Sequence, residues 1–194
     1  MNNLPTDFEI VLFASQPEWR KWLAKQHAKA PGLWLRFAKK NSGVVSVTYD
    51  EALDVALCYG WIDGLKKKYD EQTYMLRFTP RGARSVWSKI NRNKATALIE
   101  SNQMQPAGHA AIERAQQNGQ WDAAYDGQST MEVPDDLQAA LNKNAKAKKF
   151  FAELNSVNRY AILFRLQTAV KAETRAKRLR QFIEMLERQE KIHS

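Results

Sequence analysis

The stretch GWIDGLKKKYDEQTYMLRF, residues 60–78, decides the fold of the first half of the chain. Residues 61–67 and 73–78 have the composition of two β-strands, and the polar residues 69–72 between them are typical of a turn. We therefore expect an antiparallel hairpin. Residues 33–37, in which Leu and Phe alternate with Trp and Arg, predict a further strand.

Helix-start signals lie on the N-terminal side of this hairpin. The mostly apolar run before Ser15 predicts a short strand, and Ser15 with Glu18 three residues later predicts a capped helix start. Thr48 and Glu51 repeat this spacing at the start of a second helix, which Gly60 is expected to end. The N-terminal part is thus expected to combine helices with a short sheet.

After the hairpin the pattern changes to helical periodicity. A loop over residues 126–129 interrupts it and is the expected domain boundary. We expect an α+β protein, with an α/β domain over residues 1–128 and a basic, all-helical module over residues 129–194. The expected helices span residues 90–101, 107–118, 134–141, 145–154, 157–169 and 174–191.

The chain is basic. Its 194 residues include 30 Lys and Arg against 21 Asp and Glu, a formal net charge of +9. Such a surplus favours an acidic partner such as nucleic acid or an anionic surface. Residues 131–194 contribute 13 basic and 8 acidic side chains, so the C-terminal module is the more basic part.

The single cysteine and the lack of long apolar runs indicate a cytoplasmic protein. Cys58 can form no intramolecular disulfide and is expected to be a small core residue. No apolar run is long enough for a membrane span, and residues 1–13 lack the features of a secretion signal. His27, His109 and His193 are scattered, and no nucleotide-binding motif occurs, so we expect no metal and no cofactor.

Two segments carry side chains suited to binding a ligand. In residues 60–64, Asp63 needs a partner if it is buried, and Arg81 or Arg84 is the expected one. Residues 78–91 combine arginines and hydroxyls just before a helix, which suits a phosphate or a carboxylate. A structural interpretation stays open, with a capping glycine, a core tryptophan and a solvent-facing loop. The candidate ligand-binding residues are Trp61, Asp63, Arg81, Arg84, Ser85, Trp87 and Ser88, with Lys89 nearby.

Several motifs follow one another in a specific order. They are GWIDG at 60–64, Pro80-Arg81, SVWSKIN at 85–91, MQPAG at 104–108, and tail segments at 134–137, 139–141, 150–151 and 171–178. Their order and spacing resemble the YdeI or OmpD-associated family of bacteriocin-protection, OmdA-like proteins, over nearly the whole chain. The resemblance implies an α/β N-terminal part, a compact helical C-terminal part and a role in stress or bacteriocin protection. It supplies no catalytic residues.

Two functions are therefore open. The first is a protective protein that binds a small anionic ligand in a pocket between the Trp61–Asp63 strand and the Arg81–Ser88 loop. The second is an adaptor that binds nucleic acid or a protein through the basic C-terminal module. No activated nucleophile or base is identifiable, so whether the chain is an enzyme is also open. The residues of the second function are Lys171, Arg175, Lys177 and Arg178.

Overall fold

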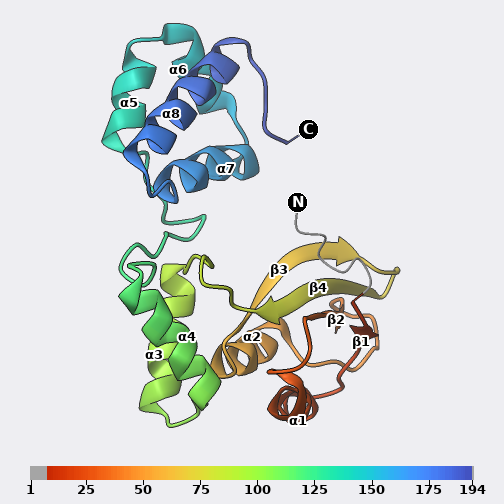
Figure 1. Ribbon diagram of the computed structural model, residues 1–194. Helices are drawn as coiled ribbons and strands as arrows, with labels where there is room; N and C mark the ends of the chain where they lie inside the picture. The colour runs from red at the N-terminus through yellow and green to blue at the C-terminus, as the bar shows by residue number, and fades with distance from the viewer. Residues whose placement is uncertain (1–7, 194) are drawn as a thin grey trace. The chain divides into compact units, whose positions relative to one another are not determined.

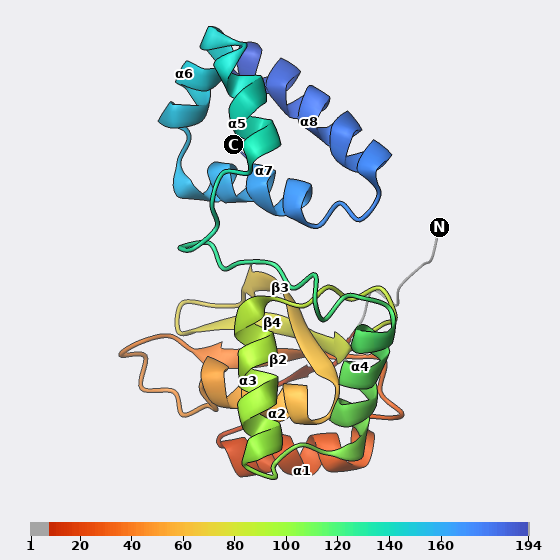
Figure 2. The ribbon, with the colours of Figure 1, turned by 90° about the vertical axis from the view of Figure 1, so that its left-hand side faces the viewer.

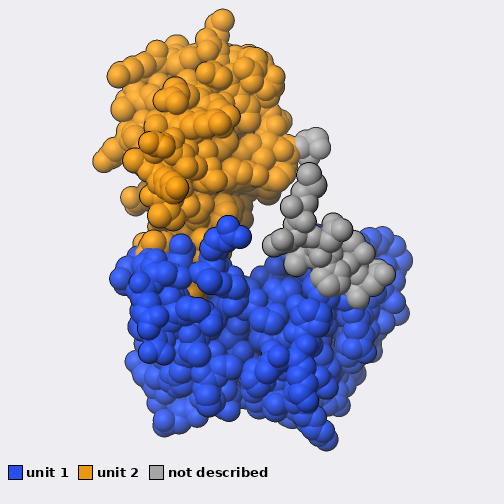
Figure 3. Space-filling model, in the orientation of Figure 1, with its two compact units in different colours: residues 1–85, 91–122 blue, residues 86–90, 123–194 orange. Residues whose placement is uncertain are grey.

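The computed structural model describes residues 8–193, which divide into two compact units (Figures 1 and 3). Unit 1 contains the described residues up to 85 and residues 91–122, and unit 2 contains residues 86–90 and the chain from residue 123 onward. The predicted fold class, a short sheet with helices followed by an all-helical part, is confirmed. The domain boundary after residue 128 stays a prediction, because compactness alone does not show which part folds independently.

A four-stranded sheet forms the centre of unit 1, with the strand order β1-β2-β4-β3. β1 runs parallel to β2, whereas β2 and β3 both run antiparallel to β4. The predicted hairpin is thus confirmed as β3 and β4, with a register shift between Asp63 and Lys66. The strands are β1 (Ile10–Val11), β2 (Leu33–Ala38), β3 (Trp61–Lys68) and β4 (Thr73–Pro80).

Two helices cover one face of this sheet, as Figures 1 and 2 show together. Because Leu33 stands opposite Phe78 and Leu35 opposite Leu76, these side chains point to the same face of the sheet. Leu33, Leu35 and Phe78 are fully buried there. The helices of unit 1 are α1 (Gln16–Gln26), α2 (Tyr49–Cys58), α4 (Pro106–Gln117) and, except for its first two residues, α3 (Lys89–Glu100).

An aromatic cluster fills the core under the sheet. The indole of Trp61 lies edge-on to those of Trp19 and Trp22, with ring centres 6.3 and 5.7 Å apart. The indole N–H of Trp19 donates to the Ala52 carbonyl at 3.0 Å, and that of Trp61 donates to the His27 carbonyl at 3.1 Å. Both rings are therefore buried without leaving a polar group unpaired.

Both ends of α2 follow the sequence signals. The Thr48 side chain accepts from the Glu51 N–H, and the Glu51 carboxylate accepts from the Thr48 N–H at 2.9 Å, so the capping box is confirmed. Gly60, just beyond the helix, has a φ of 69°. This left-handed conformation suits a glycine and ends the helix as predicted.

The start of α1 differs from the prediction in one respect. Ser15 precedes the helix, but its side chain makes no capping hydrogen bond. Pro17 has no N–H, which removes one of the two usual targets of a capping hydroxyl. The Glu18 carboxylate instead accepts from the Ala14 N–H at 2.9 Å.

In unit 2, four helices pack around a core of their own, formed by Leu137, Leu141, Phe151, Ile162, Leu166 and Leu186 among others. Asn144 and Asn155 cap two of these helices, because their side-chain oxygens accept from backbone N–H groups three residues later. In the part of the chain that the structure describes, no helix has the length and apolar character to cross a membrane. The helices are α5 (Asp135–Asn142), α6 (Ala145–Glu153), α7 (Ser156–Gln167) and α8 (Ala172–Glu187).

Candidate functional site

The end of the hairpin brings two of the predicted segments together. Trp61 begins β3 and pairs with Pro80, the last residue of β4. The backbone N–H of the next residue, Arg81, donates to the Gly60 carbonyl at 2.9 Å. The GWIDG segment and the arginine-rich segment are therefore neighbours within unit 1.

Trp61 and Arg81 are both buried at this end of the sheet, with 1% and 5% of their surfaces exposed. Trp61 is a core residue that packs on the rings of α1. A contact between its indole and a ligand stays a prediction, since the structure shows its contacts with the protein core only.

Asp63 forms its hydrogen bond with α2. The Tyr49 hydroxyl, at the start of that helix, donates to the Asp63 carboxylate at 3.0 Å. Asp63 stands opposite Phe78 on β4, so it points to the face of the sheet that α2 covers. We expected an arginine as its partner, and no local sequence signal pointed to the tyrosine.

The segment after β4 forms a turn that is held at several points. Besides the bond from Arg81, the Ser85 N–H donates to the Gly82 carbonyl at 3.0 Å. The Asn118 side chain, at the end of α4, donates to the Ala83 carbonyl at 2.8 Å. Arg84 extends from this turn, is exposed, and makes no ion pair among residues 8–193.

The other two predicted residues, Trp87 and Ser88, belong to unit 2. Both are buried, and their backbone forms a short parallel bridge with Tyr125. The Tyr125 N–H donates to the Trp87 carbonyl at 2.9 Å, and the Lys89 N–H donates to the Tyr125 carbonyl at 2.8 Å. That all seven candidate residues form one ligand site stays a prediction.

Lys89, which we expected near a bound anion, is paired within unit 2. Its ammonium lies 2.6 Å from the Asp126 carboxylate. Asp126 also accepts from the Gln167 side chain at 2.8 Å and donates its N–H to it at 3.2 Å. The hydrogen bonds from Lys89 and Gln167 lower the pKa of Asp126. Sequence reasoning missed this trio because Asp126 and Gln167 are 41 residues apart.

The four basic residues of the C-terminal module that were predicted to bind nucleic acid or a protein divide into two groups. Arg175 donates to both carboxylate oxygens of Asp136, at 2.7 and 2.8 Å. Arg178 donates to a carbonyl of α7 at 2.5 Å. Both guanidinium groups thus join helices of unit 2, whereas Lys171 and Lys177 are exposed and make no ion pair in the described chain.

The Asp136–Arg175 pair is expected to stabilise unit 2 only above acidic pH. The hydrogen bond from Arg175 lowers the pKa of Asp136 below its ordinary value of 3.8. A carboxyl with a lowered folded-state pKa stabilises the fold above its unfolded pKa, and this contribution is lost as the pH falls through the folded value. Asp136→Asn should lower the free energy of unfolding by about 1 kcal/mol at pH 7.

Urea unfolding followed by circular dichroism checks this prediction. As the pH is lowered from 7 to below 3.8, towards the lowered pKa of Asp136, the difference between Asp136→Asn and wild type should shrink. Asp135→Asn is the matched control, because the Asp135 carboxylate is exposed and makes no ion pair among the described residues. A deficit of the same size at both pH values would assign the loss to packing and contradict the ion-pair explanation.

Cys58 is fully buried at the end of α2, as predicted. Burial raises the pKa of its thiol, so the side chain is protonated at neutral pH and a weak nucleophile. Among residues 8–193, no group of three or more His, Cys, Asp or Glu side chains is placed to hold a metal ion.

Two family models match different parts of the chain. A domain of unknown function (DUF8412) matches residues 11–111. The family described as bacteriocin-protection, YdeI or OmpD-associated matches residues 130–189. Comparison with curated proteins and with solved structures found no match.

The predicted family resemblance is confirmed for the C-terminal part. The expectation that it spans nearly the whole chain is corrected, because the GWIDG, SVWSKIN and MQPAG motifs lie in the region that the DUF8412 model matches. Since that model covers more than half of the 194 residues, the chain belongs to the DUF8412 family and carries a C-terminal bacteriocin-protection, YdeI or OmpD-associated domain.

Proposed function

We propose that this chain is a protective protein whose unit 1 binds a small anionic ligand at the turn of residues 81–85. The observation that carries the proposal is the exposed side chain of Arg84, which makes no ion pair among the described residues. A guanidinium on a fixed turn can donate two parallel hydrogen bonds to a phosphate or a carboxylate. The protective role follows the description of the C-terminal family and is part of the proposal.

The turn is suited to an anion in charge and in rigidity. Residues 79–85 contain two arginines and no acidic side chain. The hydrogen bonds from Arg81, Ser85 and Asn118 fix the turn before a ligand arrives, which reduces the entropy that binding has to overcome. An anion would therefore meet a positively charged, pre-formed surface.

The other candidate residues have different parts in this proposal. Ser85, half-buried in the turn, offers its hydroxyl to the ligand. Trp61 and Asp63 hold the end of the hairpin against α1 and α2, so they support the turn through the core. The participation of Trp87 and Ser88 rests on the sequence pattern.

Arg84→Ala is expected to weaken anion binding at least tenfold without changing the fold. A charge-assisted hydrogen bond contributes about 1.5–3 kcal/mol, and an exposed side chain contributes little to stability. Calorimetric titration with phosphate, pyrophosphate and citrate measures the affinity. Arg180→Ala, which removes an exposed arginine of α8, is the matched control and should bind as wild type does.

Arg84 is the better position for this test than Arg81. Arg81 is 5% exposed, so its replacement by alanine also removes packing contacts in unit 1. A loss of anion affinity could then result from a loss of stability. Anion affinity that is the same in Arg84→Ala and in wild type would contradict the proposal. Oligonucleotide binding that survives in Arg84→Ala and falls steeply with salt would favour the adaptor, with Lys171 and Lys177 at the phosphates.

A further inference from the structure

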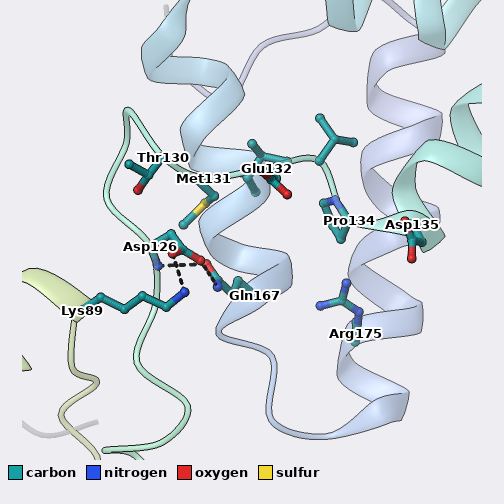
Figure 4. A pocket seen from close by; sticks show the side chains of 11 residues that line it. Lys89, Asp126, Thr130, Met131, Glu132, Pro134, Asp135, Gln167 and Arg175 are labelled. Atoms are coloured by element: carbon teal, nitrogen blue, oxygen red, sulfur yellow. Dashed lines mark hydrogen bonds and ion pairs between the residues drawn. The ribbon is translucent and has the colours of Figure 1, made fainter.

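Unit 2 contains a cavity that no sequence-predicted site includes. Its volume is about 620 Å³, within the range of about 300–1,000 Å³ that small-molecule sites occupy. Residues 130–135 form one wall, α7 and α8 contribute Leu163, Gln167 and Arg175, and Lys89 and Asp126 close one side (Figure 4). Apart from Lys89 and Asp126, the lining lies within the YdeI or OmpD-associated domain.

The two cationic side chains that line this cavity, Lys89 and Arg175, already form ion pairs with carboxylates. Figure 4 shows Lys89 and Gln167 joined to Asp126 on one side of the cavity and Arg175 on the other. Arg175 donates to both oxygens of Asp136, which raises the pKa of its guanidinium. An incoming anion would have to displace these carboxylates, so an anion is a poor match for the cavity.

The carboxylates of the cavity are in surplus. Asp126, Glu132 and Asp135 line it together with only two cations. The side chains of Glu132 and Asp135 are exposed, and their carboxylates make no ion pair or hydrogen bond among the described residues. A cation that enters the cavity therefore meets two carboxylates that no ion pair within residues 8–193 neutralises.

One part of the lining is apolar and consists of Met131, Val133, Pro134 and Leu163, beside the polar Thr130 and Gln167. Met131 and Val133 are half-buried, and Leu163 is 3% exposed. Contact with such a surface does not stabilise a hydrated inorganic ion, whereas the burial of methylene groups against it is favourable. The wall therefore favours a cation with a hydrocarbon body.

We propose that the cavity of unit 2 binds a small aliphatic amine. Its ammonium groups donate to Glu132 and Asp135, and its methylene groups lie along Met131 and Val133. Lys89 and Arg175 stay in their ion pairs and define the ends of the cavity. This site is independent of the anion site proposed for unit 1, because it uses other residues and a ligand of opposite charge.

The test is a calorimetric titration of the full chain with spermidine. We expect saturable binding in wild type and at least a tenfold weaker affinity in the double variant Glu132→Gln/Asp135→Asn. The matched control is Glu153→Gln/Glu173→Gln, which removes two exposed carboxylates of unit 2 that do not line the cavity. Because both double variants change the net charge equally, non-specific attraction affects them alike.

Three results would overturn the amine site. The first is the absence of saturable binding in wild type, and the second is an equal loss of affinity in the two double variants. The third is a competition result in which ammonium chloride displaces spermidine as completely as 1,4-diaminobutane does at the same ionic strength. In the last case the apolar wall contributes nothing. The Arg84→Ala variant should bind spermidine as wild type does, so failure of the anion site and failure of the amine site are distinguishable.

Discussion

Replacing Gly108 with alanine is expected to lower the free energy of unfolding of unit 1 by about 3 kcal/mol or more. Gly108 lies in α4 where this helix meets the end of α2. A Cβ atom there would lie within 3.0 Å of the Cys58 carbonyl oxygen and 2.8 Å from that of Leu57. Contacts under 3.0 Å essentially never occur for a real Cβ, so α4 would have to move and stretch the hydrogen bond from Gln105 to Cys58.

The intrinsic preference of alanine for helices cannot compensate for this contact. It returns only about 1 kcal/mol relative to glycine. The Met104 side chain can move away from the added Cβ, but the Cys58 and Leu57 carbonyl oxygens belong to the backbone and cannot rotate aside. Urea unfolding followed by tryptophan fluorescence measures the loss, because Trp19, Trp22, Trp34, Trp61 and Trp121 all lie in unit 1.

Gly82→Ala is the control for the glycine substitution. At Gly82 the nearest heavy atom to an added Cβ lies 3.9 Å away, so we expect a change within about 0.5 kcal/mol of wild type. If Gly108→Ala were as stable as this control, the result would contradict the close packing of α4 against the end of α2.

Local patterns predicted most elements of the fold because the interactions that form them are local. The capping box of Thr48 and Glu51 spans three residues, and the turn between β3 and β4 connects strands that are neighbours in sequence. Helical periodicity in residues 134–191 likewise predicted α5 to α8 with boundaries close to those of the structure. Such signals need no knowledge of what the element packs against.

Contacts between distant segments could not be predicted in the same way. A glycine inside a helix is unfavourable by propensity, and only the position of α2 explains Gly108. Lys89 and Arg175 were both candidates for anion binding, yet each has a carboxylate partner far along the chain. Composition counts cations without showing which are paired. Because Arg84 makes no ion pair among the described residues, the proposed anion site is centred on it.

Trp61→Ala is expected to cost about 3–5 kcal/mol, because it empties a large volume in the core of unit 1. The ring is 1% exposed and packs on Trp19 and Trp22, and its loss also leaves the His27 carbonyl without its donor. Trp61→Phe keeps part of the ring and loses the hydrogen bond, so a smaller cost of about 1–2 kcal/mol is expected.

These two variants separate a scaffold role for Trp61 from a direct contact with the ligand. If the Trp61 indole also contacted the ligand, the folded Trp61→Phe variant would lose anion affinity. We expect the reverse: Trp61→Ala is strongly destabilised, and the folded Trp61→Phe variant binds phosphate as wild type does. Arg84→Ala should show the complementary result, with unchanged unfolding and weakened binding, because its side chain is exposed on the turn that the buried indole supports.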